Sequence, residues 1–151
     1  MFRDGSARLL VFRIGAEQFG VDLARVDEVI DGPSIQPIPD ASETVHGVAT
    51  VRGELITVYD PRPVLHVDGR IDGAALLFAR NGRRIALAVD DVAEAATITQ
   101  DEVLRAPGGA LSAGDGMLLG LVRGERGGDL IALLDADALL DAVAHGDGDR
   151  R

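Results

Sequence analysis

The chain has 151 residues and a mass of 15.8 kDa, which suits one compact domain or two small lobes that share a core. Its formal net charge of −10 argues against nucleic acid and anionic membranes as partners, because both require a basic protein face. The sequence has no cysteine and no run of about 18 apolar residues, which excludes disulfides and direct membrane insertion and favours a cytoplasmic protein.

The first expected element is a β-hairpin over residues 8–23. Apolar and polar side chains alternate on both sides of Gly15 and Ala16. A two-residue turn at these positions would pair Phe12 with Phe19 on one face of the hairpin. The pattern therefore predicts two antiparallel strands at the start of the chain.

A short helix is expected directly after this hairpin. Val26, Val29 and Ile30 follow one another at helical spacing, which predicts two turns of helix over residues 24–30. Three prolines then favour an extended loop over residues 31–43.

Residues 47–60 form the second expected hairpin. If Gly53 and Glu54 make a type II′ turn, Val51 faces Ile56 across the two strands. Both faces of the hairpin are then largely apolar. One face can point into a small barrel, whereas the other must be covered by the chain itself or by a partner protein.

The strongest hairpin signal is the dipeptide Asn81–Gly82, which lies within the largely apolar residues 74–92. This dipeptide is typical of a two-residue turn between antiparallel strands. It predicts a third hairpin in which Phe78 pairs with Ile85.

The sequence also contains a loose internal repeat. A shift of 66 residues superposes the turns of the first and third hairpins, and the tetrapeptide Val-Arg-Gly-Glu occurs at residues 51–54 and 122–125. This order predicts two similar lobes. Residues 106–116 form a glycine-rich second connector, residues 117–135 are expected to supply the last strands, and residues 136–144 a short helix.

Residues suited to catalysis or metal binding do not converge in the sequence. His46, His66 and His145 lack metal-ligand spacing. Asp90 and Asp91 are neighbours on an expected strand, so their carboxylates would point to opposite faces. We therefore expect no catalytic, cofactor-binding or metal-binding residues, although a small β-barrel enzyme stays open as an alternative.

Two arginines, Arg52 and Arg123, remain to be explained. Each could simply flank a tight turn in solvent, and we favour this interpretation for Arg123. Arg52 would lie beside Leu55 and Thr57 on the uncovered hairpin face, and an arginine that borders exposed aliphatic side chains is typical of a protein-binding patch. The hypothesis requires an open cleft beside Arg52 and a guanidinium that is not locked in an internal ion pair.

Residues 47–65 resemble a hairpin motif of the CheW family, the adaptors of bacterial chemosensory arrays. The family motif is Gly-x-x-Asn-x-Arg-Gly, followed by Pro-Val-x-Asp-Leu. The runs at residues 81–99 and 120–140 agree with the family in type and order. The resemblance covers the chain from about Arg8 to Val143.

This resemblance implies a mainly all-β fold of two intertwined five-stranded SH3-like β-barrel lobes with short helices. A single CheW-like domain would cover residues 8–143. The first lobe would span about 16–72, and the second about 73–134 with a contribution from the N-terminal strand. Residues 144–151 would form a flexible tail.

The resemblance also implies a non-catalytic scaffold without a cofactor. It would couple the cytoplasmic tips of chemoreceptors, the methyl-accepting chemotaxis proteins, to the regulatory domain of a CheA-type histidine kinase. The residues that match the family's receptor side by position are Val26, Gly47, Arg52, Gly53 and Leu55. The kinase would bind mainly the second lobe, at residues that the sequence does not assign.

Three residues depart from the family motif. Thr50 stands in place of Asn, Thr57 in place of Pro, and Pro61 in place of Leu. These differences leave an alternative open, in which the CheW-like adaptor serves another chemosensory system, such as pilus motility or an alternative-function array.

Overall fold

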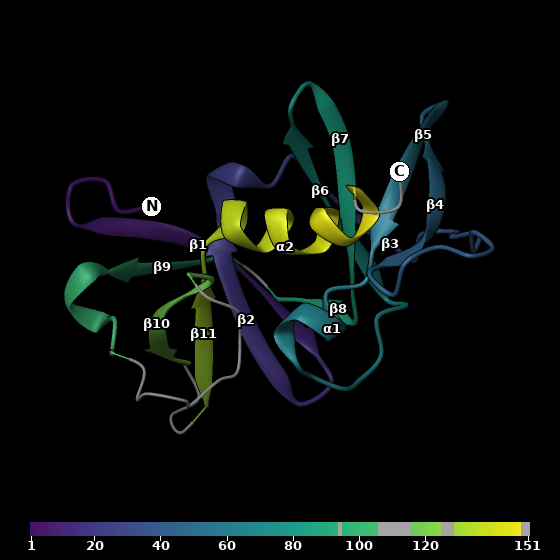
Figure 1. Ribbon diagram of the computed structural model, residues 1–151. Coiled ribbons are helices and arrows are strands. Elements are labelled where there is room, and N and C mark those ends of the chain that lie inside the picture. Colours follow the sequence, from purple (N-terminus) through teal and green to yellow (C-terminus); the bar gives the residue numbers. More distant parts are fainter. Residues whose placement is uncertain (94, 106–115, 125–128, 149–151) are drawn as a thin grey trace.

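The computed structural model describes residues 1–93, 95–105, 116–124 and 129–148. In these ranges the fold is mainly β, as predicted, with two sheets and a few short helices (Figure 1). The first sheet, the terminal lobe, contains β1 (Ser6–Ile14), β2 (Glu17–Asp22), β8 (Asp91–Val92), β9 (Ala96–Thr99), β10 (Leu118–Arg123) and β11 (Leu130–Leu134). The second sheet, the central lobe, contains β3 (Glu28–Asp31), β4 (Val45–Val51), β5 (Glu54–Tyr59), β6 (Ala74–Arg80) and β7 (Arg83–Val89).

The helices are short, apart from the last one. Two 3-10 helices are η1 (Leu23–Arg25) and η2 (Gln100–Glu102), and the α-helices are α1 (Arg62–Leu65) and α2 (Ala136–Gly148). The terminal helix predicted from residue 136 is confirmed, and it continues past residue 144 to Gly148. Within the described ranges, no helix is long and apolar enough to cross a membrane.

The two lobes share one strand order, as the internal repeat predicts. The central lobe has the order β3-β6-β7-β5-β4, and the terminal lobe has β8-β1-β2-β11-β10, with β9 also on β1. Each sheet has one parallel pair, β5 with β7 and β11 with β2, in the same place. The terminal lobe therefore joins the first two strands of the chain to its last four, so the lobes are intertwined.

Sheet membership differs from the lobe limits expected from the sequence. The hairpin of β6 and β7 lies after residue 73 but belongs to the central lobe, because β6 pairs with β3 and β7 pairs with β5. Strand β2 lies after residue 16 but belongs to the terminal lobe, because it pairs with β1 and β11.

The hairpin at the end of the strand order, β4–β5 in the central lobe and β10–β11 in the terminal lobe, is built in the same way in both lobes. The ladder of β4 and β5 is irregular just before Gly47, and the ladder of β10 and β11 is irregular just before Gly120. Three residues after each glycine, Thr50 pairs with Leu55 and Arg123 pairs with Leu130. Arg123 is therefore the counterpart of Thr50 and lies in a strand, so the repeated tetrapeptide does not mark equivalent positions.

The predicted pairings of the first and third hairpins are confirmed. Phe12 pairs with Phe19, and their stacked rings have centroids 5.6 Å apart. Phe78 pairs with Ile85. The glycine-rich connector expected at residues 106–116 lies outside the described residues except for Gly116, which has a positive φ.

The register predicted for the second hairpin is wrong by two residues. Val51 pairs with Glu54 instead of Ile56, because the turn consists of Arg52 and Gly53. Both turn residues have positive φ angles, 48° and 82°, as a type I′ turn requires. A shift of two residues leaves the side chains of the paired strand residues on their predicted faces, whereas Arg52 moves from the strand into the turn.

The helix predicted over residues 24–30 is also wrong. The 3-10 helix η1 ends at Arg25, and the following residues form strand β3, in which Ile30 pairs with Ala75 of β6. Long-range strand pairing thus overrides the helical spacing of three aliphatic residues.

Helix α2 connects the two lobes. It lies across the molecule between the sheets (Figure 1), and it buries Leu139, Leu140 and Val143 in the core cluster that both sheets share. Two ion pairs hold its outer face. Arg25 Nη1 lies 2.6 Å from Asp137 Oδ1, and Arg80 forms an ion pair with Asp141. The helix therefore fills part of the space between the lobes.

Candidate protein-binding surface

The tip of the β4–β5 hairpin presents an aliphatic side chain beside an arginine. Leu55 is 69% exposed and pairs with Thr50, which is also exposed. Arg52 and Gly53 form the turn that carries the chain back. A large exposed aliphatic side chain next to an arginine is the composition expected of a protein-contact patch. We call Thr50, Arg52, Gly53 and Leu55 the hairpin tip.

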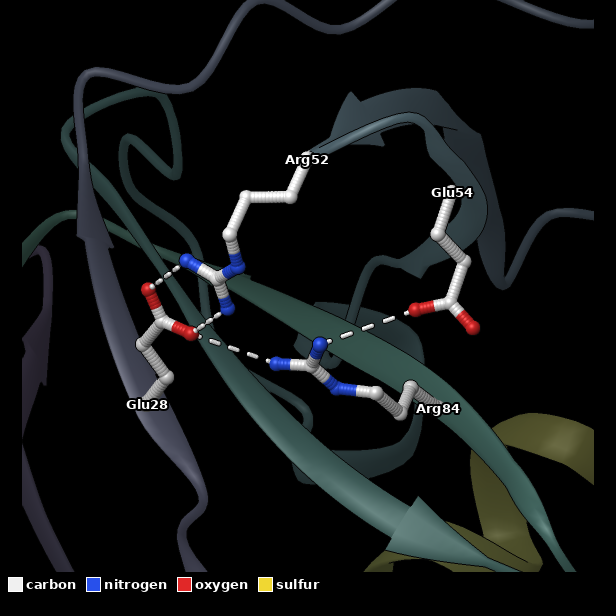
Figure 2. A network of polar contacts seen from close by, with 4 residues as sticks. All are labelled: Glu28, Arg52, Glu54 and Arg84. Atoms are coloured by element: carbon white, nitrogen blue, oxygen red, sulfur yellow. Dashed lines mark hydrogen bonds and ion pairs between the residues drawn. The ribbon is translucent and has the colours of Figure 1, made fainter.

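Arg52 forms an ion pair with Glu28 of strand β3 (Figure 2). Its Nη1 donates to Glu28 Oε2 at 2.8 Å, and its Nη2 donates to Oε1, so the contact is bidentate. One of the two conditions that would contradict the binding hypothesis is therefore present. The ion pair lies at the surface, however, because the Arg52 side chain is 62% exposed, and a partner can reach it.

A second arginine joins this pair into a network of four side chains. Arg84 of β7 places Nη2 3.2 Å from Glu28 Oε1 and Nη1 3.6 Å from Glu54 Oε1 (Figure 2). Arg84 is only 27% exposed, and its buried Nε has no hydrogen-bond partner among the described residues. The network joins β3, the first strand of the sheet order, to the hairpin at the other end of that order. It therefore holds together the two borders of the central lobe.

The network also shifts the pKa values of Glu28 and Arg52. The hydrogen bond from Arg52 lowers the pKa of Glu28 from 4.5 to about 2, against the opposing effect of desolvation, and Arg84 acts in the same direction. The same hydrogen bond raises the pKa of Arg52. Both groups are therefore ionised at neutral pH.

Gly47 and Val26 have less exposed positions than the hairpin tip. Gly47 is buried, and a Cβ atom at this position would lie 2.3 Å from the carbonyl oxygen of Gln36 and 2.8 Å from Cγ2 of Ile35. Val26 follows η1, is partly buried and packs against the shared core. Gly47 is therefore a tightly packed position, and Val26 exposes only part of its side chain.

The three departures from the family motif have different surroundings. Thr50 is exposed on the hairpin tip, and Thr57 is half-buried between Val48 and Ile85. Pro61 is buried at the N-terminus of α1. Of the three, only Thr50 is exposed.

The described residues offer binding contacts more than reactive groups. In the part of the chain that the structure describes, no group of three or more His, Asp or Glu side chains could hold a metal ion. His46 lies at the irregular position of β4, and His66 caps α1 in a left-handed conformation. Ion pairing and apolar contact are the chemistry that the hairpin tip can supply.

Sequence reasoning missed Glu28 and Arg84. The role of Glu28 was not predicted, because residues 24–30 were expected to form a helix. Only a strand at these residues brings Glu28 close to the hairpin tip. Arg84 follows the predicted turn at Asn81 and Gly82. Its position in a hairpin strand was predictable, but its two carboxylate partners, at 28 and 54, required the tertiary fold.

Comparison with known proteins identifies the family. A protein-family model described as "CheW-like domain" matches residues 8–144 of the sequence. The chain belongs to the CheW-like domain family. The resemblance inferred from the hairpin motif is therefore confirmed.

Relatives and a solved structure agree with this membership. The chemotaxis protein CheW of Klebsiella aerogenes is 26% identical over 136 residues, which cover 88% of this chain and 81% of that protein. The chemotaxis protein CheW of Treponema pallidum is 24% identical over 147 residues, which cover 92% and 85%. The crystal structure of the scaffolding protein TtCheW from Thermoanaerobacter tengcongensis matches with a TM-score of 0.70 at 23% identity, covering 85% of this chain and 88% of that chain.

Proposed function

We propose that this CheW-like protein is a non-catalytic adaptor, which couples the cytoplasmic tips of chemoreceptors to the regulatory domain of a CheA-type histidine kinase. The observation that carries the proposal is the family match over residues 8–144, which includes strands of both lobes and helix α2 as far as residue 144. An adaptor needs two contact surfaces on one rigid body, and two lobes bound through a shared core supply such a body. The proposed location is the cytoplasm.

The hairpin tip is the proposed receptor contact. Receptor tips are helical, and a helix can dock on an aliphatic patch whose border carries a bidentate arginine. Leu55 would supply the apolar contact. Arg52 would contribute through its exposed edge, while Glu28 keeps its guanidinium in place. Val26, at the end of η1, and Gly47, in β4, would support this contact through packing.

The kinase would bind the terminal lobe. This arrangement leaves the hairpin tip of the central lobe free for a receptor, so both partners can be held at once. Leu130, the counterpart of Leu55 in the terminal lobe, is 45% exposed. It therefore provides a matched position at which to separate the two contacts.

The experiment compares Leu55→Asp with Leu130→Asp by calorimetry, using a receptor-tip fragment and a kinase regulatory domain from the same bacterium. We expect Leu55→Asp to weaken receptor binding by about 2 kcal/mol or more, as at a buried hot spot, with kinase binding retained. Leu130→Asp should leave receptor binding unchanged. Equal loss of receptor binding in both variants, or no loss in either, would contradict the assignment of the hairpin tip. Absence of binding of the wild-type protein to both partners would contradict the adaptor role.

A second candidate is an adaptor of another chemosensory system, such as pilus motility. The exposed Thr50 favours it, because this departure from the family motif lies where a partner would touch. The discriminating experiment offers the wild-type protein kinase regulatory domains from each chemosensory gene cluster of its source. Preference for a kinase that does not control flagellar swimming would establish this alternative.

A further inference from the structure

The terminal lobe contains a polar pocket of about 620 Å³. Val11 and Ile131, members of the smaller core cluster, form its apolar base. Its polar lining comprises Arg13, Gln18, Asp91 and Asp129. The hairpin tip and its ion-pair network belong to the other lobe, so this pocket is separate from the surface described above.

The repeat places this pocket where the central lobe has its ion-pair network. In the central lobe, the Asp27 amide donates to the carbonyl oxygen of Leu77 at 2.8 Å, next to Glu28. In the terminal lobe, the Ala93 amide donates to the carbonyl oxygen of Val11 at 2.8 Å. The shift of 66 residues relates the two donors, Asp27 and Ala93, and it also relates the two acceptors, Val11 and Leu77. The two sites are therefore equivalent.

The lobes differ in what occupies this site. Gln18 is the counterpart of Arg84 by the same shift. Asp129 precedes Leu130 as Glu54 precedes Leu55, so the two carboxylates are counterparts. The terminal lobe thus keeps the carboxylate but replaces the arginine that neutralises it with a neutral amide.

Within the described residues, neither carboxylate of the pocket has a cationic partner. No ion pair joins Asp91 or Asp129 to another described side chain. Among the described residues of the pocket lining, Arg13 is the one cation, and its Nη2 donates to the carbonyl oxygen of Gly15 at 3.3 Å. The described part of the lining therefore has two carboxylates for one guanidinium, and that guanidinium is bonded to the turn at Gly15.

We propose that this pocket binds a guanidinium group, namely an arginine side chain presented by a partner protein. The bound guanidinium would take the place that Arg84 holds in the central lobe, and it would pair with Asp129 in particular. Planar guanidinium groups bind carboxylates through two parallel hydrogen bonds, and the aliphatic stem of the arginine would lie on the apolar base. The net charge of −10 favours the approach of basic segments.

The test titrates isotope-labelled full-length protein with acetyl-arginine amide, followed by NMR. We expect saturable shifts of the backbone amides of Gln18, Asp91 and Asp129, with a dissociation constant in the millimolar range. Acetyl-citrulline amide has the same shape without the charge, and it should bind at least about tenfold more weakly. Equal shifts with both compounds, or no saturable shift with the arginine compound, would overturn the proposal.

Two variants make the test specific to the pocket. Asp129→Asn should weaken binding about tenfold, whereas Asp31→Asn, with the same change of charge on the other lobe, should have no effect. Gln18→Arg should abolish binding, because it restores the arginine of the central lobe within the chain. Equal losses in Asp129→Asn and Asp31→Asn, or full binding by a folded Gln18→Arg protein, would refute the site. The outcome is independent of the adaptor role, since no receptor or kinase is present.

Discussion

Replacing Gly47 with alanine tests how the candidate surface is held in place. The added Cβ would lie 2.3 Å from the carbonyl oxygen of Gln36, far inside contact distance. The segment cannot move away freely, because Gln36 and Val48 exchange two backbone hydrogen bonds of 2.8 and 2.9 Å. Overpacking costs about 1–3 kcal/mol, and each strained or lost hydrogen bond adds about 1 kcal/mol. We therefore expect a loss of about 3 kcal/mol.

Urea unfolding measures this loss. With a slope of about 1–3 kcal/mol per molar urea, Gly47→Ala should lower the unfolding midpoint by about 1–3 M. Gly124→Ala is the control, because the nearest atom to its added Cβ would be Cβ of Asp129, at 3.4 Å. The free energy of unfolding of this variant should stay within about 0.5 kcal/mol of the wild-type value. A Gly47→Ala protein as stable as wild type would refute the packing role. Gly47 would then have to act, if at all, through direct contact.

Three further changes test other parts of the fold. Asp60→Ala removes a nearly buried carboxylate that accepts Arg62 Nη2 at 2.7 Å, so thermal or urea unfolding should show a loss of about 2–3 kcal/mol; a loss under about 0.5 kcal/mol would contradict this role. Leu139→Ala empties a fully buried position in α2 and should cost about 2–5 kcal/mol, while a near-neutral result would mean that α2 does not join the lobes. Because folding lowers the pKa of Glu28 from 4.5 to about 2, its ion pair stabilises the fold above pH 4.5, and this contribution is lost as the pH falls towards 2. The stability difference between wild type and Glu28→Gln should therefore shrink over that range and with added salt, and a difference independent of pH would contradict the ion pair.

The sequence predicted the hairpins that have a conventional turn. Asn81 and Gly82 favour positive φ angles, and the structure has 51° and 75° at these residues, so the pairing of the third hairpin followed directly. The turn at Arg52 was missed because arginine rarely adopts a positive φ. In the structure the ion pair with Glu28 holds Arg52 at that position, and such long-range support cannot be derived from local sequence preferences.

The limits of prediction at the candidate site have one physical source. Val26, Val29 and Ile30 have the spacing of a helix, but β3 forms because β6 offers an unpaired edge. A helix over residues 24–30 would not have been expected to bring Glu28 into contact with Arg52 or Arg84. The exposed Leu55 was predictable, since its face follows from alternation alone. The ion-pair network was not, because its members come from three separate parts of the chain.

Simultaneous binding of both partners tests the adaptor role most directly. Sedimentation velocity of the protein with a receptor-tip fragment and a kinase regulatory domain would measure it. We predict one species that contains all three components and sediments faster than either binary complex. Two binary complexes that exclude one another, or no complex with either partner, would contradict the coupling of receptor to kinase by this two-lobed protein.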